Sequence, residues 1–461
     1  MEYPQEKTMK EKGHDFTEGR IVSPLMRFAL PIILALFLQA MYGAVDLLVV
    51  GKFASPEDVS AVSTGSQIMM TFTSLVTSLA MGTTIFFAQQ LGMGHRKEGG
   101  EIVGASIAFF TLLGLLMTFL IPLFARPIAS LMQAPADAFE QTVQYIRICG
   151  AGMLAIVAYN LIGAVFRSMG DSKTPLITVA IACAVNILGD LLLIAVFHMG
   201  TAGAAIATVA AQLVSVVVSL LLISRSSLPF EFRRSMIRFH TRIIRKIVQL
   251  GFPIALQELL VGISFLVVMA VVNGLGVVAS AGIGVAGKVC TFIMLVPIAL
   301  SQAISAFVAQ NTGAGKDDRS VKALKSSICV SLVFALGMFL LGFFRGNLLT
   351  GIFASDPDVI QAGAEYLKAY AIDCLFTCFL FCFIGYFNGI GCTTFVMVQG
   401  LIGAFCVRTP FCILMSHLEP VSLFRIGLAT PASTVVQILL CFAFLFHQNR
   451  KRRTTRTSPP V

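Results

Sequence analysis

Six ionisable side chains fall inside stretches that are apolar enough to cross a membrane, and they divide unevenly along the chain. The first half contributes two acids, Asp46 and Asp190. The second half contributes two acids and two bases: Glu258, Asp373, Lys288 and Arg408. A charge at bilayer depth is costly and usually marks an ion path or a paired partner. These six residues are therefore the first candidates for chemistry.

The two acids of the first half lack a basic residue at comparable depth in the same segments. Two carboxylates in one low-dielectric bundle cannot both stay charged cheaply, so we expect them to bind a proton, a Na+ ion or a cationic substrate. Oxygen donors of the kind that hard cations prefer occur on the same or neighbouring segments. They are Gln39, Tyr42, Tyr145, Asn160, Asn186 and Thr208.

Two interpretations of these groups stay open. In the first, Asp46 and Asp190 form a coupling-ion or substrate site with the six oxygen donors, and a bound Na+ would lie at Asp46, Asn186, Asp190 and Thr208. In the second, Asp46 lies near the outer end of its segment and is partly solvated. The four charges of the second half, Glu258, Lys288, Asp373 and Arg408, could neutralise one another as buried ion pairs or could contact substrate.

The elements that must position these residues are membrane-spanning helices. Of the residues, 57% are hydrophobic and only 12% are charged, and the mean hydropathy is +0.87, which excludes a water-soluble globular domain. The apolar runs are too long and too rich in glycine for barrel strands, so we predict an all-α membrane protein. Twelve spans are expected, at 25–51, 59–91, 102–124, 141–166, 175–197, 201–224, 247–273, 277–310, 322–344, 361–387, 394–415 and 422–447.

An internal repeat relates the two halves of the chain. Phe87-Ala88-Gln89-Gln90-Leu91-Gly92-Met93-Gly94 returns 221 positions later as Val308-Ala309-Gln310-Asn311-Thr312-Gly313-Ala314-Gly315. Such a duplication is typical of transporters built from two homologous bundles, here two parallel six-helix bundles. The expected parts are an N-terminal tail at 1–23, bundles at 24–224 and 247–448, a basic linker at 225–246 and a C-terminal tail at 449–461.

The distribution of basic residues predicts that both termini and the linker are cytoplasmic. With that orientation 25 of the 33 Lys and Arg residues lie inside and six lie outside, as the positive-inside rule requires. The linker, with apolar residues among its arginines, suggests an amphipathic helix on the membrane surface. The net charge of +10 is then explained by contact with anionic membrane lipid rather than with nucleic acid.

Motifs of other functional classes are missing from the sequence. It contains no GxxxxGK[ST], HExxH or GxSxG pattern, so we expect neither an ATP motor, nor a catalytic metal, nor an enzyme, and no cofactor. Cys374, Cys378 and Cys382 lie one helical turn apart and could form a soft-metal site or serve as small packing residues. No obligate protein partner is indicated, and a monomer is expected.

The chain resembles the multidrug and toxic compound extrusion (MATE) family from about Pro24 to Gln448. The resemblance is carried by short motifs in a fixed order. They are Pro31 with Val45-Asp46-Leu47-Leu48-Val49-Val50-Gly51, the Ala88–Gly94 phrase, Arg167-Ser168-Met169-Gly170-Asp171-Ser172-Lys173-Thr174-Pro175, Asn186-x-x-x-Asp190, and Gly200-x-x-Gly203-Ala204-Ala205-Ile206-Ala207-Thr208.

The resemblance implies a twelve-helix antiporter in the cytoplasmic (inner) membrane that exports organic cations or drugs in exchange for H+ or Na+. It places the cation site at positions matching Asp46, Asn186, Asp190, Thr208, Asn160 and Tyr145. Some relatives instead carry coupling acids on the seventh and tenth helices, which here hold Glu258 and Asp373. The alternative is a flippase for lipid-linked saccharides, which shares the general architecture but would want a cleft lined by basic residues.

Overall fold

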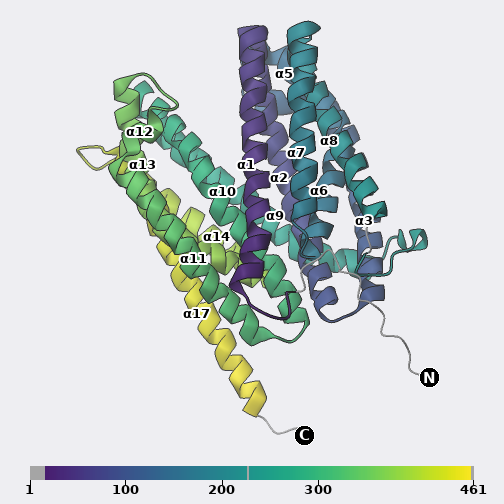
Figure 1. Cartoon of the computed structure of the whole chain (residues 1–461). Helices are drawn as coiled ribbons and strands as arrows, with labels where there is room; N and C mark the ends of the chain where they lie inside the picture. The colour runs from purple at the N-terminus through teal and green to yellow at the C-terminus, as the bar shows by residue number, and fades with distance from the viewer. Residues whose placement is uncertain (1–15, 226–227, 458–461) are drawn as a thin grey trace, which may run out of the picture. The chain divides into compact units, whose positions relative to one another are not determined.

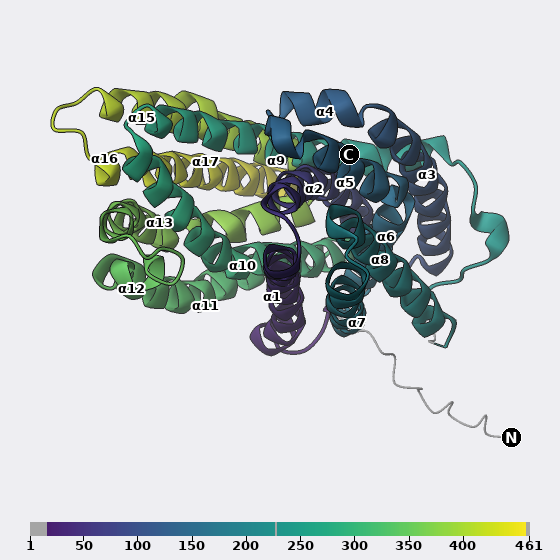
Figure 2. The ribbon, with the colours of Figure 1, turned by 90° about the horizontal axis from the view of Figure 1, so that it is seen from above.

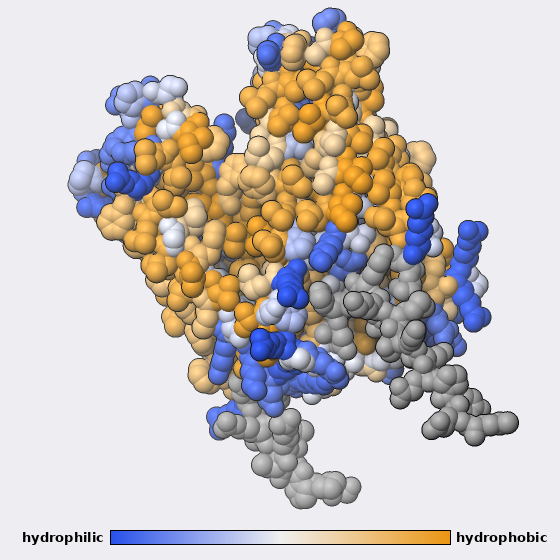
Figure 3. Space-filling view, viewed as in Figure 1, coloured by the Kyte–Doolittle hydropathy of each residue, from blue (hydrophilic) through white to orange (hydrophobic). Residues whose placement is uncertain are grey.

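The computed structural model describes residues 16–225 and 228–457, and in these ranges the regular structure is helical. Eleven helices are long and apolar enough to cross a membrane, and one bent pair brings the number of candidate spans to twelve. The twelve predicted spans and the all-α class are therefore confirmed. On the face shown in Figure 3, hydrophobic residues cover the middle of the long helices and hydrophilic residues gather toward their ends. The predicted tails at 1–23 and 449–461 fall partly outside the described ranges.

The first compact unit comprises Met1–Ala255 and Ala306–Ser320. Helices α1 and α7 pack side by side in it, and α7 packs in turn on α8 (Figures 1 and 2). Its helices are α1 (Val22–Phe53), α2 (Pro56–Gly92), α3 (Arg96–Leu123), α4 (Ala125–Leu131), η1 (Ala136–Ala138), α5 (Phe139–Ala151), α6 (Met153–Ser168), α7 (Lys173–Asp190), η2 (Leu191–Val196), α8 (Gly200–Ser224) and η3 (Arg234–Met236).

The second compact unit comprises Leu256–Ser305 and Val321–Val461. Helices α9, α10 and α11 each have one end in the first unit. The tenth span, α13, packs against α16 and α17. The helices are α9 (Thr241–Asn273), α10 (Val277–Gly313), α11 (Asp317–Phe344), α12 (Gly346–Thr350), α13 (Pro357–Gly389), α14 (Thr393–Leu401), η4 (Ile402–Arg408), α15 (Thr409–Ser416), α16 (Leu423–Gly427) and α17 (Ala429–Thr457).

Several spans depart from a regular α-helix. The fourth span bends by 52° at the junction of α5 and α6, where Gly152 fits against Val209 with no room for a side chain. The fifth span of each half contains a π-helical turn, η2 after Asp190 and η4 ending at Arg408. Such turns are rare and frequently occur at functional sites. In this chain each adjoins a buried ionisable residue.

The duplicated motif places the ends of α2 and α10 in backbone contact within the first unit. A Cβ on Gly92 would collide with the carbonyl oxygen of Gln310, and a Cβ on Gly313 would collide with the carbonyl oxygen of Gln89. The contact is reciprocal because each copy contributes the same two positions. Glycine is thus required here for close approach of two helices rather than for a turn.

An N-terminal strap, Phe16–Arg20, is held against the end of α10 and the start of α11. The Phe16 ring is fully buried and lies 5.1 Å from the rings of both Phe28 and Phe307. Asn311 Nδ2 donates to the Phe16 carbonyl at 3.1 Å. The Arg319 guanidinium donates to four strap carbonyls, those of Phe16, Glu18, Gly19 and Arg20.

The linker before the second repeat makes a comparable contact with the end of α2 and the start of α3. Phe230 lies 5.1 Å from the Phe87 ring, and the Glu231 amide donates to the Arg96 carbonyl at 3.3 Å. The amphipathic helix predicted for this linker is wrong over residues 228–240, which contain only the short turn η3. The chain is otherwise non-helical there because its backbone packs onto Gly100 and Gly104, where a Cβ would meet linker atoms.

We predict that Gly313→Ala lowers the free energy of unfolding by about 1–3 kcal/mol, the usual cost of overpacking. The added methyl would meet the Gln89 backbone, which cannot rotate away. The measurement is the thermal unfolding midpoint of the purified protein in detergent. Gly337→Ala is the matched control, since nothing lies within 4 Å of that position. Equal stability of the two variants would contradict the close-contact interpretation.

We also predict that Arg319→Gln loosens the N-terminal strap by removing its charge-assisted hydrogen bonds, which contribute roughly 1.5–3 kcal/mol each before solvent screening. Limited trypsin digestion should then cleave after Arg20 faster than in the parent protein. Lys322→Gln, an exposed neighbour on the same helix, should leave the cleavage rate unchanged. A parental rate in Arg319→Gln would show that the strap is held by its other contacts, the buried Phe16 ring and the hydrogen bonds from Asn311 and Lys316.

Candidate functional site

Two buried carboxylates face a common region of the first unit. Asp46 on α1 is 4% exposed, and Asp190, the last residue of α7, is fully buried. Helices α1 and α7 pack together, and the two carboxylates are near enough for their charges to interact. The two acids predicted from the sequence lie far apart in the chain, and the structure brings them together.

Asn186 and Thr208 adjoin the carboxylates from α7 and α8. Asn186 Nδ2 is 3.5 Å from Thr208 Oγ1, which leaves the amide oxygen Oδ1 without a donor among the described residues. Asp46 Oδ1 and both carboxylate oxygens of Asp190 likewise receive no hydrogen bond from the part of the chain that the structure describes. Four buried acceptor oxygens are thus left without donors.

This set of atoms is suited to a small positive ion. Buried polar atoms are almost always satisfied, so acceptors left without donors call for a proton, a cation or ordered water. Carboxylate, amide and hydroxyl oxygens are the ligands that hard cations prefer. Within residues 16–225 and 228–457, no group of three or more His, Cys, Asp or Glu side chains could hold a metal ion. The donor set therefore fits Na+ or H+ better than a transition metal.

Two tyrosines border the cluster. Tyr145 on α5 is 2% exposed and lies beside Thr208 and Asp46. Its ring fills the space over Gly65, where a Cβ would collide with it. Tyr42 precedes Asp46 by one turn of α1 and is near enough to feel its charge. Both predicted tyrosines are therefore placed next to the acids.

Gln39 and Asn160 make hydrogen bonds to other polar residues of the bundle. Gln39 Nε2 donates to the Tyr159 hydroxyl at 3.3 Å. Asn160 Oδ1 accepts from Thr77 Oγ1 at 2.7 Å, and its Nδ2 donates to the Ile156 carbonyl at 2.8 Å. Nothing in the sequence singles out Thr77, which is one of many hydroxyl residues on α2. Tyr159 could have been found as the neighbour of Asn160.

The four charges of the second half are not brought together as one self-neutralising set. Asp373 and Arg408 are 3% and 5% exposed, whereas Glu258 and Lys288 are exposed on the surface of the described unit. The exposure of Glu258 and Lys288 disfavours the interpretation of all four as buried ion pairs. Contact of these residues with substrate stays a prediction.

Asp373 and Arg408 form separate contacts. Asp373 Oδ2 accepts from Thr377 Oγ1 at 2.9 Å. Arg408 Nη1 donates to the Ser264 hydroxyl at 3.0 Å, and its guanidinium carbon lies 4.1 Å from the centroid of the Phe265 ring. The cysteines of α13, Cys374, Cys378 and Cys382, are buried. The Cys378 thiol donates to the Leu375 carbonyl at 3.0 Å, which favours their packing role.

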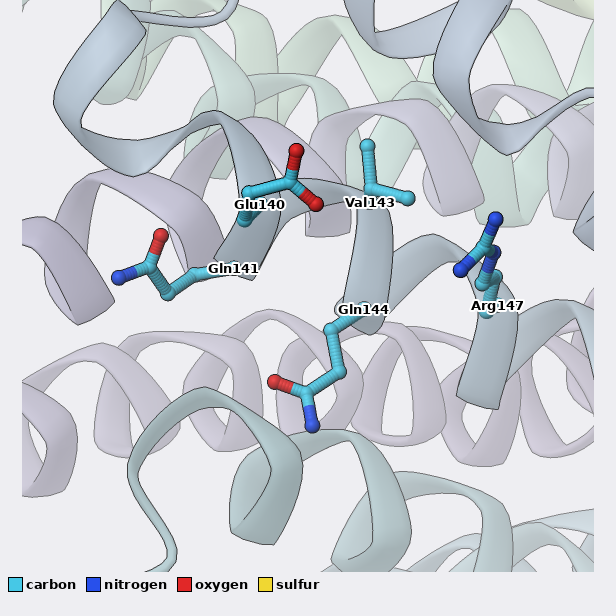
Figure 4. Close-up of a pocket in the computed structure, with 5 residues that line it drawn as sticks. All are labelled: Glu140, Gln141, Val143, Gln144 and Arg147. Atoms are coloured by element: carbon cyan, nitrogen blue, oxygen red, sulfur yellow. The ribbon is translucent and has the colours of Figure 1, made fainter.

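A surface pocket on α5 lies outside the acid cluster. It is lined by Glu140, Gln141, Val143, Gln144 and Arg147, which project from successive turns of one helix (Figure 4). Glu140 is already paired with Arg126, at 2.8 Å between Oε2 and Nη2. The lining shares no residue with the cluster around Asp46 and Asp190.

The chain matches known proteins over nearly its full length. The MatE family profile matches residues 31–192 and again 253–414. Probable multidrug resistance protein YpnP of Bacillus subtilis (strain 168) is 29% identical over 88% of this chain and 91% of its own. Probable multidrug resistance protein NorM of Thermotoga maritima is 23% identical over 88% of this chain and 86% of its own.

Solved structures share the fold. A multidrug resistance MATE family transporter of the MOP superfamily in an outward-facing conformation superposes with a TM-score of 0.88, at 18% identity, over 97% of this chain and 99% of its own. A MOP superfamily transporter from Pyrococcus furiosus superposes with a TM-score of 0.87, at 18% identity, over 94% and 98%. The two profile matches coincide with the two halves of the internal repeat. The chain therefore belongs to the MatE family and is a multi-pass membrane transporter, not an enzyme.

Proposed function

We propose that this protein is a secondary antiporter that exports organic cations, including drugs, in exchange for H+ or Na+. The observation that carries the proposal is the cluster of four buried acceptor oxygens on Asp46, Asn186 and Asp190 that lack donors in the described residues. The relatives named as multidrug resistance proteins support the substrate class. Without a nucleotide-binding motif in the sequence, the energy for export comes from an ion gradient.

The coupling ion binds in the first unit under this proposal. Two interacting carboxylates retain a net negative charge unless a cation or protons join them. An ion arriving from outside neutralises them, and the approach of a cationic substrate competes for the same charge. Because only differential binding between conformations can shift a population, export requires that the ion favour one conformation and the substrate another.

The duplicated motif lies at the cytoplasmic ends of two helices of the first unit under this proposal. In the first unit, Gly92 and Gly313 hold the ends of α2 and α10 in backbone contact. Both ends lie on the cytoplasmic side if the basic residues face inward, as the positive-inside rule requires. The protein works as a monomer in the cytoplasmic membrane, with both termini inside.

We predict that the double variant Asp46→Asn, Asp190→Asn loses gradient-driven efflux of a fluorescent organic cation from proteoliposomes. The two substituted side chains keep their shape but can no longer become anionic, so neither H+ nor Na+ is held. Separate H+ and Na+ gradients identify the coupling ion. Asp137→Asn, an exposed acid of the same unit, is the matched control and should transport normally.

Unimpaired efflux by the double variant under both gradients would overturn the assignment of the site. Transport of a lipid-linked saccharide without any ion gradient would instead favour the flippase alternative.

A further inference from the structure

The second unit contains a buried arginine that is held by few contacts. Arg408 ends the π-helical turn η4 and is 5% exposed. Its Nη1 donates to Ser264 at 3.0 Å, and its guanidinium lies on the Phe265 ring, 4.1 Å from the centroid. Its Nε makes no hydrogen bond to any residue that the structure describes. A guanidinium so deeply buried would ordinarily be fully hydrogen-bonded.

A buried acid lies close to this arginine. Asp373 on α13 is 3% exposed, and it is near enough to Arg408 for the charges to interact. One of its oxygens accepts from Thr377, and the other, Oδ1, finds no donor in the described residues. The charges of Asp373 and Arg408 therefore compensate each other although the two side chains form no direct hydrogen bond.

Phe265 and Asp373 surround the positive charge of Arg408 with an aromatic face and a carboxylate. These are the groups that proteins use to bind organic cations. Cations are attracted to the face of an aromatic ring within about 6 Å of its centroid, and a nearby carboxylate supplies the opposite charge. Phe265 remains 39% exposed, so the ring can be reached from outside the unit. The guanidinium occupies the position that a planar cationic ligand would take.

We propose that Ser264, Phe265 and Asp373 form an organic-cation subsite that the chain's own Arg408 occupies. Arg408 is then a specificity-determining residue. A ligand cation enters the subsite only by displacing the guanidinium, and the charge balance of Asp373 is the same before and after. This proposal rests on one part of the proposed function, namely that organic cations reach the second unit.

The local backbone is suited to such a displacement. Arg408 lies at the end of a π-helical turn, where the regular hydrogen-bond ladder is interrupted. Thr409 Oγ1 donates to the Ala404 carbonyl at 3.0 Å within this turn, and Pro410 follows without an amide hydrogen. Displacement must break the hydrogen bond to Ser264 and the contact with the Phe265 ring, and it must also overcome the attraction of the nearby Asp373 carboxylate.

The test is equilibrium binding of ethidium, a planar aromatic monocation, to the purified full-length protein. Arg408→Gln should bind ethidium about tenfold more tightly than the parent, the gain expected from a vacated cation–π site. Arg408→Met, which replaces the charge by an apolar chain of similar length, should show the same gain and serves if the glutamine variant fails to fold. Arg425→Gln, an exposed arginine of the same unit, should bind as the parent does.

A second substitution identifies the partner of the ligand. Adding Asp373→Asn to Arg408→Gln should return the affinity to the parental value, because the carboxylate that holds the ligand is gone. The proposal is overturned if correctly folded Arg408→Gln and Arg408→Met bind ethidium no more tightly than the parent. It is also overturned if Arg408→Gln with Asp373→Asn keeps the full gain in ethidium affinity. The gain should persist in a protein carrying Asp46→Asn and Asp190→Asn, so failure of the subsite is distinguishable from failure of the coupling site.

Discussion

A carboxylate buried in an apolar helix bundle must acquire a compensating positive charge, and the two halves of this protein meet that requirement differently. The first half leaves the acceptor oxygens of Asp46, Asn186 and Asp190 without donors in the described residues. The second half supplies a cation of its own, Arg408, near Asp373. The first arrangement needs an ion from solution, whereas the second is balanced by the chain itself. Under the two proposals, the first half holds the coupling ion that a cationic substrate displaces, and the second half adds a subsite that tunes which cations bind.

The two halves share a backbone design despite this difference in chemistry. Each contributes one copy of the duplicated motif, and the two copies pack glycine against carbonyl in a reciprocal contact. Each also has a π-helical turn in its fifth span, next to Asp190 in one half and at Arg408 in the other. The leading segment of each half is anchored by a phenylalanine, Phe16 or Phe230, which packs on Phe307 or Phe87. Duplication thus preserved the scaffold while the ionisable residues diverged.

The sequence predicts the spans well because a long apolar run in lipid can form little except a helix. It also predicts that Asp46, Asn186, Asp190 and Thr208 belong together, since two buried acids need a cation and a cation needs further oxygen ligands. It does not predict the π-helical turns, in which each hydrogen bond spans five residues instead of four and which leave no periodic signal. The failed prediction of a linker helix has a similar cause. Amphipathic periodicity cannot reveal that Gly100 and Gly104 offer a surface for non-helical backbone.

Under the proposed mechanism a cation neutralises Asp46 and Asp190 until substrate binds. The decisive experiment measures what the purified protein releases when it binds an organic cation, with a pH indicator for H+ and a sodium electrode for Na+ in a weakly buffered solution. We expect release of H+ or Na+ upon binding and no release from Asp190→Asn. Tight binding that releases neither ion from the parent protein would rule this mechanism out.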